Sequence, residues 1–445
     1  MTQRTIAALA TPQGIGGIAV IRVSGTEAIS VCDKIFKGKK PLSEAETHTV
    51  HYGHIVWDEK VIDEVLVTVM RAPKTYTTED VVEISTHGGV VASKLVLDAL
   101  MKSGAYPAEP GEFTKRAFLN GRIDLSRAEG VIDIINSRTH IEERNALSQA
   151  EGRLSKEIND MRASLVNLAA RMQVAIDYPD EDLEDVTLDE IGEILGEIAG
   201  KTDKLLATAN HGRVLKNGIK TAIVGKPNVG KSSLLNCMAG VDRAIVTDIA
   251  GTTRDVIEEF VDFEGVPLVL LDTAGIHETE DTVEKIGVER SKRAIEEAEL
   301  VILMLDLSRK IEAEDKELLS VTEDKKRIIV ANKSDIKTEK IENAIEISVK
   351  TGEGMDRLSE EIRKLYNLGE LESGGIVVTN LRHISALSRA KEALLRAGDA
   401  VAGGLPQDLA ALDIYSAIDI LGEITGDTVS ESIVSEIFHN FCVGK

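Results

Sequence analysis

The chain has 445 residues, which is more than one ordinary domain needs, so two to four domains are expected. Its hydrophobic content of 43% and charged content of 29% are typical of a soluble globular protein, and an aromatic content of 3% favours helices and α/β units over an all-β sandwich. The net charge of −23 argues against non-specific binding of nucleic acid, because phosphate contacts need Lys and Arg.

The acidity lies outside the first part of the chain. Residues 1–120 hold 13 basic and 14 acidic residues and so carry a net charge of −1, which leaves −22 for the rest. Cys32, Cys237 and Cys442 are odd in number and widely spaced, which argues against a disulfide framework and a zinc site. No signal-peptide core is evident, and no apolar run approaches the ~20 residues of a membrane span. We therefore expect a cytoplasmic protein.

Residues 1–120 predict an α+β domain. Residues 18–23, 65–70 and 81–85 are short and rich in β-branched side chains, as strands are, and residues 93–101 favour a helix. Glycines punctuate the connections between these elements.

From about residue 121 the apolar period becomes helical. Apolar residues from Leu147 to Ala175 recur at steps of three and four, which predicts one long helix, and similar stripes follow from Leu188 to Leu205 and within 380–440. These stripes flank a stretch of alternating strands and helices typical of a parallel sheet. We predict an all-α domain interrupted by an α/β domain, with boundaries at 1–120, 121–216, 217–369 and 370–445.

A phosphate loop opens the α/β stretch. The segment GKPNVGKSS at 225–233 fits G-x-x-x-x-G-K-S and lies between an expected strand at 219–224 and an expected helix at 232–238. Its glycines let backbone N–H groups surround a phosphate at a helix N-terminus. We expect Lys231 to reach the β- and γ-phosphates and Ser232 to bind Mg²⁺.

Three further motifs follow expected strands in the order of a GTP-binding domain. DTAG at 272–275 places an Asp near Mg²⁺ and a Gly near the γ-phosphate, NKSD at 332–335 supplies Asp335 for the guanine edge, and SVK at 348–350 closes over the guanine oxygen. TDIAGTTRDV at 247–256 has the small polar composition of a switch loop, with Thr252 or Thr253 near Mg²⁺. The predicted GTP-binding residues are Asn228, Val229, Gly230, Lys231, Ser232, Ser233, Thr247, Asp248, Ile249, Ala250, Gly251, Thr252, Thr253, Asp272, Thr273, Ala274, Gly275, Asn332, Lys333, Asp335, Ser348, Val349 and Lys350.

The water-positioning group is not evident from these motifs. In Ras-like enzymes a Gln follows DTAG and orients the attacking water, but Ile276 stands at that place here. Another residue or a partner must orient the attacking water. Glu284 is a candidate, although its position alone favours an ordinary acidic residue at a helix start.

Six segments of the chain closely resemble the family of tRNA-modifying GTPases called MnmE or TrmE, and the resemblance runs from end to end. These segments are TPQGIGGIAVIRVSG at 11–25, EDVVEISTHGG at 79–89, PGEFTKRAFLNGRIDLSRAEGVIDII at 110–135, TDIAGTTRD at 247–255, DTAG with VEKIGVER within 272–290, and FCVGK at 441–445. The resemblance implies a folate-binding N-terminal domain that forms a homodimer, a helical domain, and a Ras-like G domain inserted into the helices.

The resemblance also implies an activity. Such proteins act with a partner similar to MnmG (GidA) that carries FAD, and together they form 5-carboxymethylaminomethyl or 5-aminomethyl uridine at the tRNA wobble position. The one-carbon unit comes from 5-formyl- or 5,10-methylene-tetrahydrofolate. Because this chain is so acidic, we expect tRNA to bind mainly through the partner.

The family's site residues map onto positions of this sequence. The resemblance makes Glu284 the water-orienting residue and Lys231 and Cys442 further catalytic candidates, although an inert thiol remains an equal alternative for Cys442. By similarity, Mg²⁺ is held by Ser232 and Thr253, and K⁺ by Asn228, Thr247, Ile249 and Thr252. The matching folate-binding residues are Arg22, Glu83, Arg122 and Lys445.

Two other functions stay open at this point. One is a regulatory GTPase that times ribosome or RNA assembly without modification chemistry, and the other is a folate sensor without transfer chemistry. A pure switch needs neither the cationic folate residues nor the FCVGK segment, so the ends of the chain favour the modification enzyme.

Overall fold

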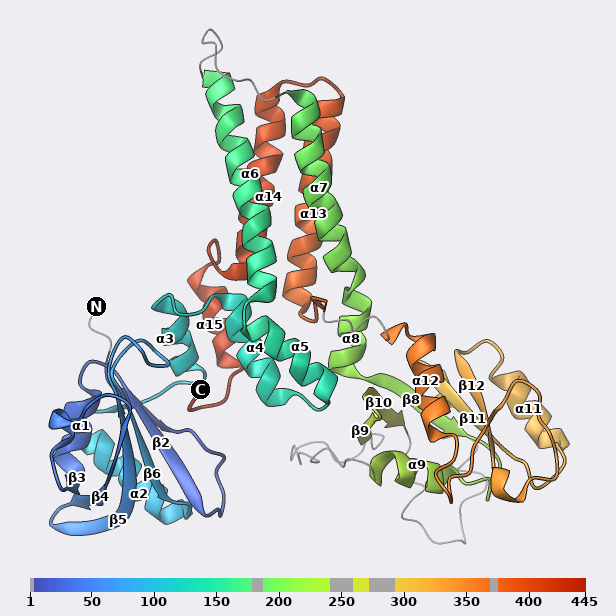
Figure 1. Cartoon of the computed structure of the whole chain (residues 1–445), viewed down its shortest axis with the longest axis horizontal. Coiled ribbons are helices and arrows are strands. Elements are labelled where there is room, and N and C mark those ends of the chain that lie inside the picture. Colours follow the sequence, from blue (N-terminus) through green and yellow to red (C-terminus); the bar gives the residue numbers. More distant parts are fainter. Residues whose placement is uncertain (1–3, 178–186, 241–258, 272–292, 369–374) are drawn as a thin grey trace. The chain divides into compact units, whose positions relative to one another are not determined.

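The structure is a computed structural model that describes residues 4–177, 187–240, 259–271, 293–368 and 375–445 (Figure 1). The chain forms two compact units. One comprises Met1–Ile132, Gln149–Asn167 and Ile418–Lys445, and the other comprises Asp133–Ser148 and Leu168–Ala417. An α+β part, a set of long helices and an α/β part are all present, which confirms the predicted fold class.

The N-terminal part is built on a seven-stranded sheet of order β3-β4-β5-β6-β2-β1-β7. All neighbouring strands are antiparallel except β1 and β7. The strands are β1 (Ile6–Leu9), β2 (Ile18–Ser24), β3 (Phe36–Gly38), β4 (Thr49–Trp57), β5 (Lys60–Met70), β6 (Val81–His87) and β7 (Tyr106–Pro107).

Two helices, α1 (Ala28–Ile35) and α2 (Val90–Ser103), pack on one face of this sheet. Their buried side chains form one core with alternate residues of β5 and β6, such as Val67 and Ile84. The other face carries exposed apolar residues. Ile18, Val50, Tyr52 and Leu66 are 67%, 60%, 59% and 49% exposed, and the strand register places all four on this side.

Three short helices complete this unit with the C-terminal segment. They are α3 (Glu112–Leu119), the first part of α4 (Leu125–Asn136), and α15 (Glu431–His439). Phe438 and Phe441 pack with Leu125 and Val434 in a small aromatic and aliphatic core. The C-terminal segment contacts α3, since the backbone N–H of Phe113 donates to the carbonyl oxygen of Lys445 at 3.2 Å.

The other helices outside the α/β part are α5 (His140–Ala150), α6 (Arg153–Asp177), α7 (Leu188–Ala207), α8 (Ala209–Asn217), α13 (Leu381–Ala402) and α14 (Gln407–Thr425). The expectation of one helix over residues 147–175 was wrong. The chain breaks at Gly152, whose φ of +93° lies outside the helical region, and Leu147 is 49% exposed on α5. Helices α7 and α13 pack together through buried residues such as Ile198 and Ala390.

The α/β part contains a six-stranded sheet of order β13-β12-β11-β8-β10-β9, parallel except at β9. Every residue of β10 and β11 is buried, as expected of central parallel strands covered on both faces. Its strands are β8 (Ile219–Val224), β9 (Glu259–Phe263), β10 (Val266–Leu271), β11 (Leu300–Asp306), β12 (Arg327–Asn332) and β13 (Ile345–Glu346). Its helices include α9 (Lys231–Gly240), α11 (Ala313–Val321) and α12 (Met355–Leu365).

Helical residues of the same unit hold this α/β part at several points. Arg213 of α8 makes a two-pronged ion pair with Glu299, at 2.8 and 3.1 Å, just before β11. The Arg138 guanidinium lies 4.9 Å from the centroid of the Phe260 ring on β9. Among the helices described, none is both long and apolar enough to cross a membrane.

Candidate functional site

The predicted nucleotide-binding segments meet at one edge of the six-stranded sheet. Strands β8, β11, β12 and β13 are parallel, so their carboxyl ends lie at the same edge. The phosphate loop follows β8 directly, Asn332 ends β12, and Ser348 follows β13. The topology thus brings the phosphate loop at 225–233 together with the motifs at 332–335 and 348–350, which lie about a hundred residues further along the chain.

Asn332 connects the phosphate loop to the guanine-recognition segments. Its amide nitrogen donates to the carbonyl oxygen of Val229 at 2.8 Å, and its amide oxygen accepts a bond from the backbone N–H of Val349 at 3.1 Å. Gly230 must be glycine here for two reasons. Its φ is +105°, and a Cβ atom would lie 2.3 Å from the Asn332 amide nitrogen.

Lys231 is the first residue of α9, and its ammonium group is held by its own loop. It donates to the carbonyl oxygens of Gly225 at 2.7 Å and Lys226 at 2.8 Å. Burial lowers the pKa of Lys231 from its usual 10.5. Ser232 and Asn228 are exposed beside it, and their hydroxyl and amide oxygens are hard donors that suit Mg²⁺ and K⁺.

The guanine-recognition motif is ordered by two polar contacts. The Ser348 hydroxyl donates to a carboxylate oxygen of Asp335 at 2.9 Å, which orients an exposed carboxylate. Lys333 forms an ion pair with Asp306 at 2.6 Å. Burial would raise the pKa of Asp306, but hydrogen bonds from Lys333 and Ser308 outweigh burial and lower it.

A second attachment of the phosphate loop is not predicted by any sequence motif. The ammonium group of Lys226 forms ion pairs with Glu312 and with Glu314, the latter at 3.0 Å, at the start of α11. The Lys226 side chain is only 9% exposed, so this contact is a second attachment of the phosphate loop besides that of Asn332. Both glutamates lie in an acidic run of the sequence, and only the folded chain shows that they pair with Lys226.

Part of the predicted site lies outside the described residues. This applies to the whole switch loop, to the DTAG motif and to Glu284. The residues concerned are Thr247, Asp248, Ile249, Ala250, Gly251, Thr252, Thr253, Asp272, Thr273, Ala274, Gly275 and Glu284. Within the described residues, no group of three or more His, Cys, Asp or Glu side chains has a metal-binding arrangement.

A second polar cluster lies on the face of the N-terminal sheet opposite to α1 and α2, where Phe113 of α3 packs on Ile6 and Ala8 of β1. Arg22 on β2 faces Glu83 on β6 in register, and their side chains form an ion pair at 2.8 Å. Arg22 also donates to the carbonyl oxygen of Gly444 at 3.4 Å, and its guanidinium lies 5.7 Å from the centroid of the buried Phe113 ring. The C-terminal segment therefore reaches residues that were predicted from the N-terminal strands.

The other predicted folate residues belong to the same cluster. Arg122 donates to the carbonyl oxygen of Tyr76 at 2.9 Å. Burial lowers the pKa of Lys445 from 10.5, and the positive charge of Arg22 lowers it further. Cys442 is exposed and directly follows the buried Phe441. Its role stays a prediction.

Tyr76, Phe113 and Gly444 are members of this cluster that the sequence interpretation missed. The Tyr76 ring lies 5.5 Å from the Arg22 guanidinium and 4.9 Å from that of Arg122. An aromatic residue in the polar segment TYTTED was the available signal, since such a residue usually has a packing or stacking purpose.

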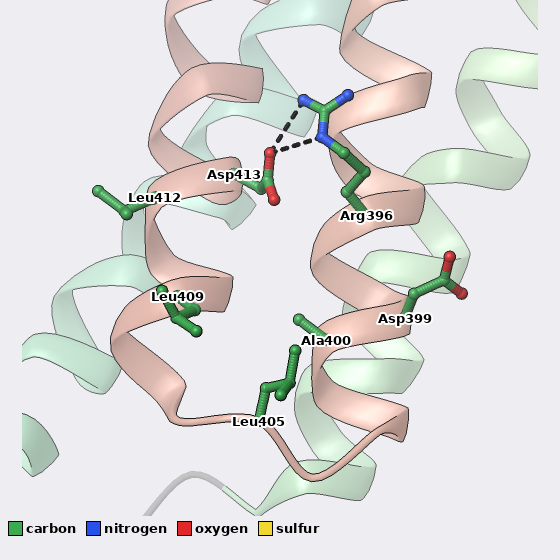
Figure 2. Close-up of a pocket in the computed structure, with 7 residues that line it drawn as sticks. All are labelled: Arg396, Asp399, Ala400, Leu405, Leu409, Leu412 and Asp413. Atoms are coloured by element: carbon green, nitrogen blue, oxygen red, sulfur yellow. Dashed lines mark hydrogen bonds and ion pairs between the residues drawn. The ribbon is translucent and has the colours of Figure 1, made fainter.

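A hollow between α13 and α14 is separate from both clusters. Arg396 and Asp413 form an ion pair at 2.9 Å along one side, and Leu405, Leu409 and Leu412 line the other (Figure 2). Leu409 and Leu412 are 46% and 66% exposed. None of the predicted site residues lines this hollow.

The parallel sheet, the phosphate loop and the guanine-recognition contacts define the class of protein: a P-loop GTPase. Within that class the comparisons are specific. The model of the TrmE N-terminus ("GTP-binding protein TrmE N-terminus") matches residues 5–122, and that of the MnmE helical domain matches residues 125–442.

Relatives match over nearly the whole length. The tRNA modification GTPase MnmE of Acetivibrio thermocellus is 48% identical, over 99% of this chain and 99% of that protein, and that of Lactobacillus acidophilus is 49% identical, over 99% and 98%. The G domain of the T. maritima FeoB iron transporter is 28% identical, over 33% of this chain and 98% of that chain, with a TM-score of 0.24. The chain belongs to the MnmE family of tRNA modification GTPases.

Proposed function

We propose that this chain hydrolyses GTP to drive the modification of carbon 5 of the tRNA wobble uridine. The products are 5-carboxymethylaminomethyl or 5-aminomethyl uridine, formed with an FAD-containing partner of the MnmG type. One observation carries the proposal: the same chain holds a guanine-nucleotide site and, on a separate sheet, a cationic cluster beside a carboxylate.

The cationic cluster suits a tetrahydrofolate derivative. A folate has a flat heterocycle with N–H donors and an acidic glutamate tail. The Glu83 carboxylate is an acceptor for such donors, and Arg122 and Lys445 offer positive charge to the tail. The proposed ligand is 5-formyl- or 5,10-methylene-tetrahydrofolate.

The GTP site accommodates the proposed cations by its chemistry. Ser232 with Thr253 would hold Mg²⁺, and Asn228 with Thr247, Ile249 and Thr252 would hold K⁺. When bound, these cations supply positive charge at the phosphates, as an arginine does in other GTPases. The chain's own contribution is the Lys231 ammonium group and a water held by Glu284.

The exposed apolar residues on the sheet face opposite to α1 and α2 support the proposed homodimer. Tyr52 and Leu66 are cross-strand neighbours there, and both are exposed beside Val50 and Ile18. An apolar sheet face of this kind is typical of a surface that meets a partner. Replacing Leu66 with Lys is expected to shift the protein from dimer to monomer in sedimentation analysis.

The modification itself tests the function. Transfer RNA from cells with and without the gene would be digested, and wobble uridine analysed by mass spectrometry. Loss of the 5-substituted uridine, restored by the intact protein but not by Lys231→Ala, supports the proposal. If the modification persists without the gene and no second enzyme explains it, the proposal is wrong and a regulatory GTPase switch is the better assignment.

A further inference from the structure

We propose that Tyr76 is a positioning residue of the folate site, which holds the guanidinium groups of Arg22 and Arg122 where they meet the ligand. The inference rests on the proposed folate function and adds to it a residue with a role in selecting the ligand. Tyr76 lies in the loop between β5 and β6, at the edge of the cationic cluster.

The Tyr76 residue contacts both arginines. The guanidinium carbon of Arg122 is 4.9 Å from the ring centroid, and that of Arg22 is 5.5 Å from it. Arg122 is held a second time through its bond to the Tyr76 carbonyl oxygen at 2.9 Å. An aromatic ring attracts a cation through its quadrupole. It can therefore hold two guanidinium groups without neutralising their charge, whereas a carboxylate would neutralise one of them.

Tyr76 is itself fixed in place. Its hydroxyl is hydrogen-bonded to the hydroxyl of Thr114 at 2.9 Å, and Thr114 is completely buried. The neighbouring residue Thr77 is also buried and is bonded to Ser24 at 2.7 Å. Because Tyr76 and its neighbour Thr77 are both held by hydrogen bonds to buried groups, the Tyr76 ring is a rigid support for the two arginine side chains.

The two arginines differ in what balances their charge. Arg22 is paired with the Glu83 carboxylate, whereas Arg122 has no carboxylate partner within the described part of the chain. The end near Glu83 therefore suits the N–H donors of the heterocycle, and the end near Arg122 suits the acidic tail. Since Tyr76 lies between them, its ring sets the position of the tail-binding cation relative to the heterocycle.

The test uses full-length protein and two ligands. Calorimetric titration would compare 5-formyltetrahydrofolate with a tetrahydropterin that lacks the glutamate tail. Tyr76→Leu removes the ring, and Tyr76→Phe keeps the ring but loses the bond to Thr114. Tyr106→Leu is the matched control, because the Arg4 guanidinium lies 4.8 Å from the Tyr106 ring, at the opposite edge strand β7.

We expect Tyr76→Leu to weaken binding of 5-formyltetrahydrofolate by roughly tenfold and to leave the tailless pterin within about threefold of wild type. Tyr106→Leu should bind both ligands like wild type. Tyr76→Phe, which keeps the ring but loses its bond to Thr114, should weaken folate binding less than Tyr76→Leu does. Equal weakening of both ligands by Tyr76→Leu would mean a general structural effect and would overturn the inference. Unchanged binding of the folate by Tyr76→Leu would overturn it as well, while the folate function would stand. If wild-type protein binds no folate, the proposed folate function fails first and the inference fails with it.

Discussion

The side-chain amide of Asn332 donates to the carbonyl oxygen of Val229 at 2.8 Å, joining two motifs that lie 103 residues apart in sequence. The same side chain accepts the backbone N–H of Val349, so a single amide ties the phosphate loop to both guanine-recognition segments.

Asn332→Ala is expected to weaken GDP binding about tenfold or more. Each of the two lost hydrogen bonds contributes on the order of 1 kcal/mol, and 1.4 kcal/mol corresponds to a factor of ten. Titration with a fluorescent GDP analogue measures the effect. Lys337→Ala, which removes a peripheral ion pair with Glu346, serves as the control and should bind like wild type. An unchanged affinity in Asn332→Ala would show that the loop holds its shape without this bridge.

Nucleotide affinity should depend on the charge of Lys231. Burial lowers its pKa below 10.5 in the nucleotide-free protein, and bound phosphates favour the ammonium form and so raise that pKa again. The affinity for GDP is therefore highest below the lowered pKa of Lys231 and falls as the pH rises through that pKa. Binding measured over an alkaline pH series would show this fall in wild type and its loss in Lys231→Met. A wild-type curve parallel to that of the variant would contradict the assignment.

The Lys333–Asp306 ion pair is expected to stabilise the α/β part. The pKa of Asp306 is lowered, so its contribution is present above its unfolded pKa of 3.8 and is lost as the pH falls through the lowered folded value. At neutral pH, Asp306→Asn should reduce the free energy of unfolding by about 1–3 kcal/mol, because the Lys333 ammonium group loses a charged acceptor.

Denaturant unfolding of Asp306→Asn, followed by circular dichroism, would measure this loss. Glu346→Gln is the matched comparison, since it breaks the more exposed Lys337–Glu346 pair, which should contribute at most about 1 kcal/mol. Equal stability losses in the two variants would show that the lower exposure of Asp306 gives its pair no greater effect.

Gly444 should control the folate site without touching the GTP site. Its φ is +96°, and a Cβ atom there would lie 2.3 Å from the carbonyl oxygen of Leu9. Gly444→Ala is expected to displace the carbonyl oxygen that Arg22 contacts and to weaken folate binding by about tenfold or more, with GDP affinity unchanged. Val443→Ala, at a 54% exposed neighbour, is the control. Folate affinity equal to wild type in Gly444→Ala would contradict this contact.

The α/β part was the most predictable region of the fold. The strand predicted at 219–224 coincides with β8, because a short run rich in β-branched residues directly before a glycine-rich phosphate loop has few alternatives. The long-helix prediction failed at Gly152. The apolar stripe continues across the break between α5 and α6, so periodicity alone does not reveal that the helix ends there. Strand β4 was missed because its exposed residues Val50 and Tyr52 remove the usual alternation.

The sites show a similar division. Residues of the phosphate loop and of NKSD could be assigned because their function depends on fixed local spacing. Tyr76 and Lys226 could not, because their role depends on partners that come from distant segments: Arg122 for one, Glu312 and Glu314 for the other. The domain boundaries and the individual ligand roles remain predictions.

The contact between Arg22 and Gly444 spans 422 residues of sequence, and this sets a time order during synthesis. At about 5–20 residues per second, translation needs on the order of half a minute or more after Arg22 is made before Gly444 can reach it. The N-terminal sheet and the GTP site can form during that interval, but the folate cluster cannot. If a ribosome stalls within the last helix, the unfinished chain would thus bind nucleotide but not the one-carbon carrier.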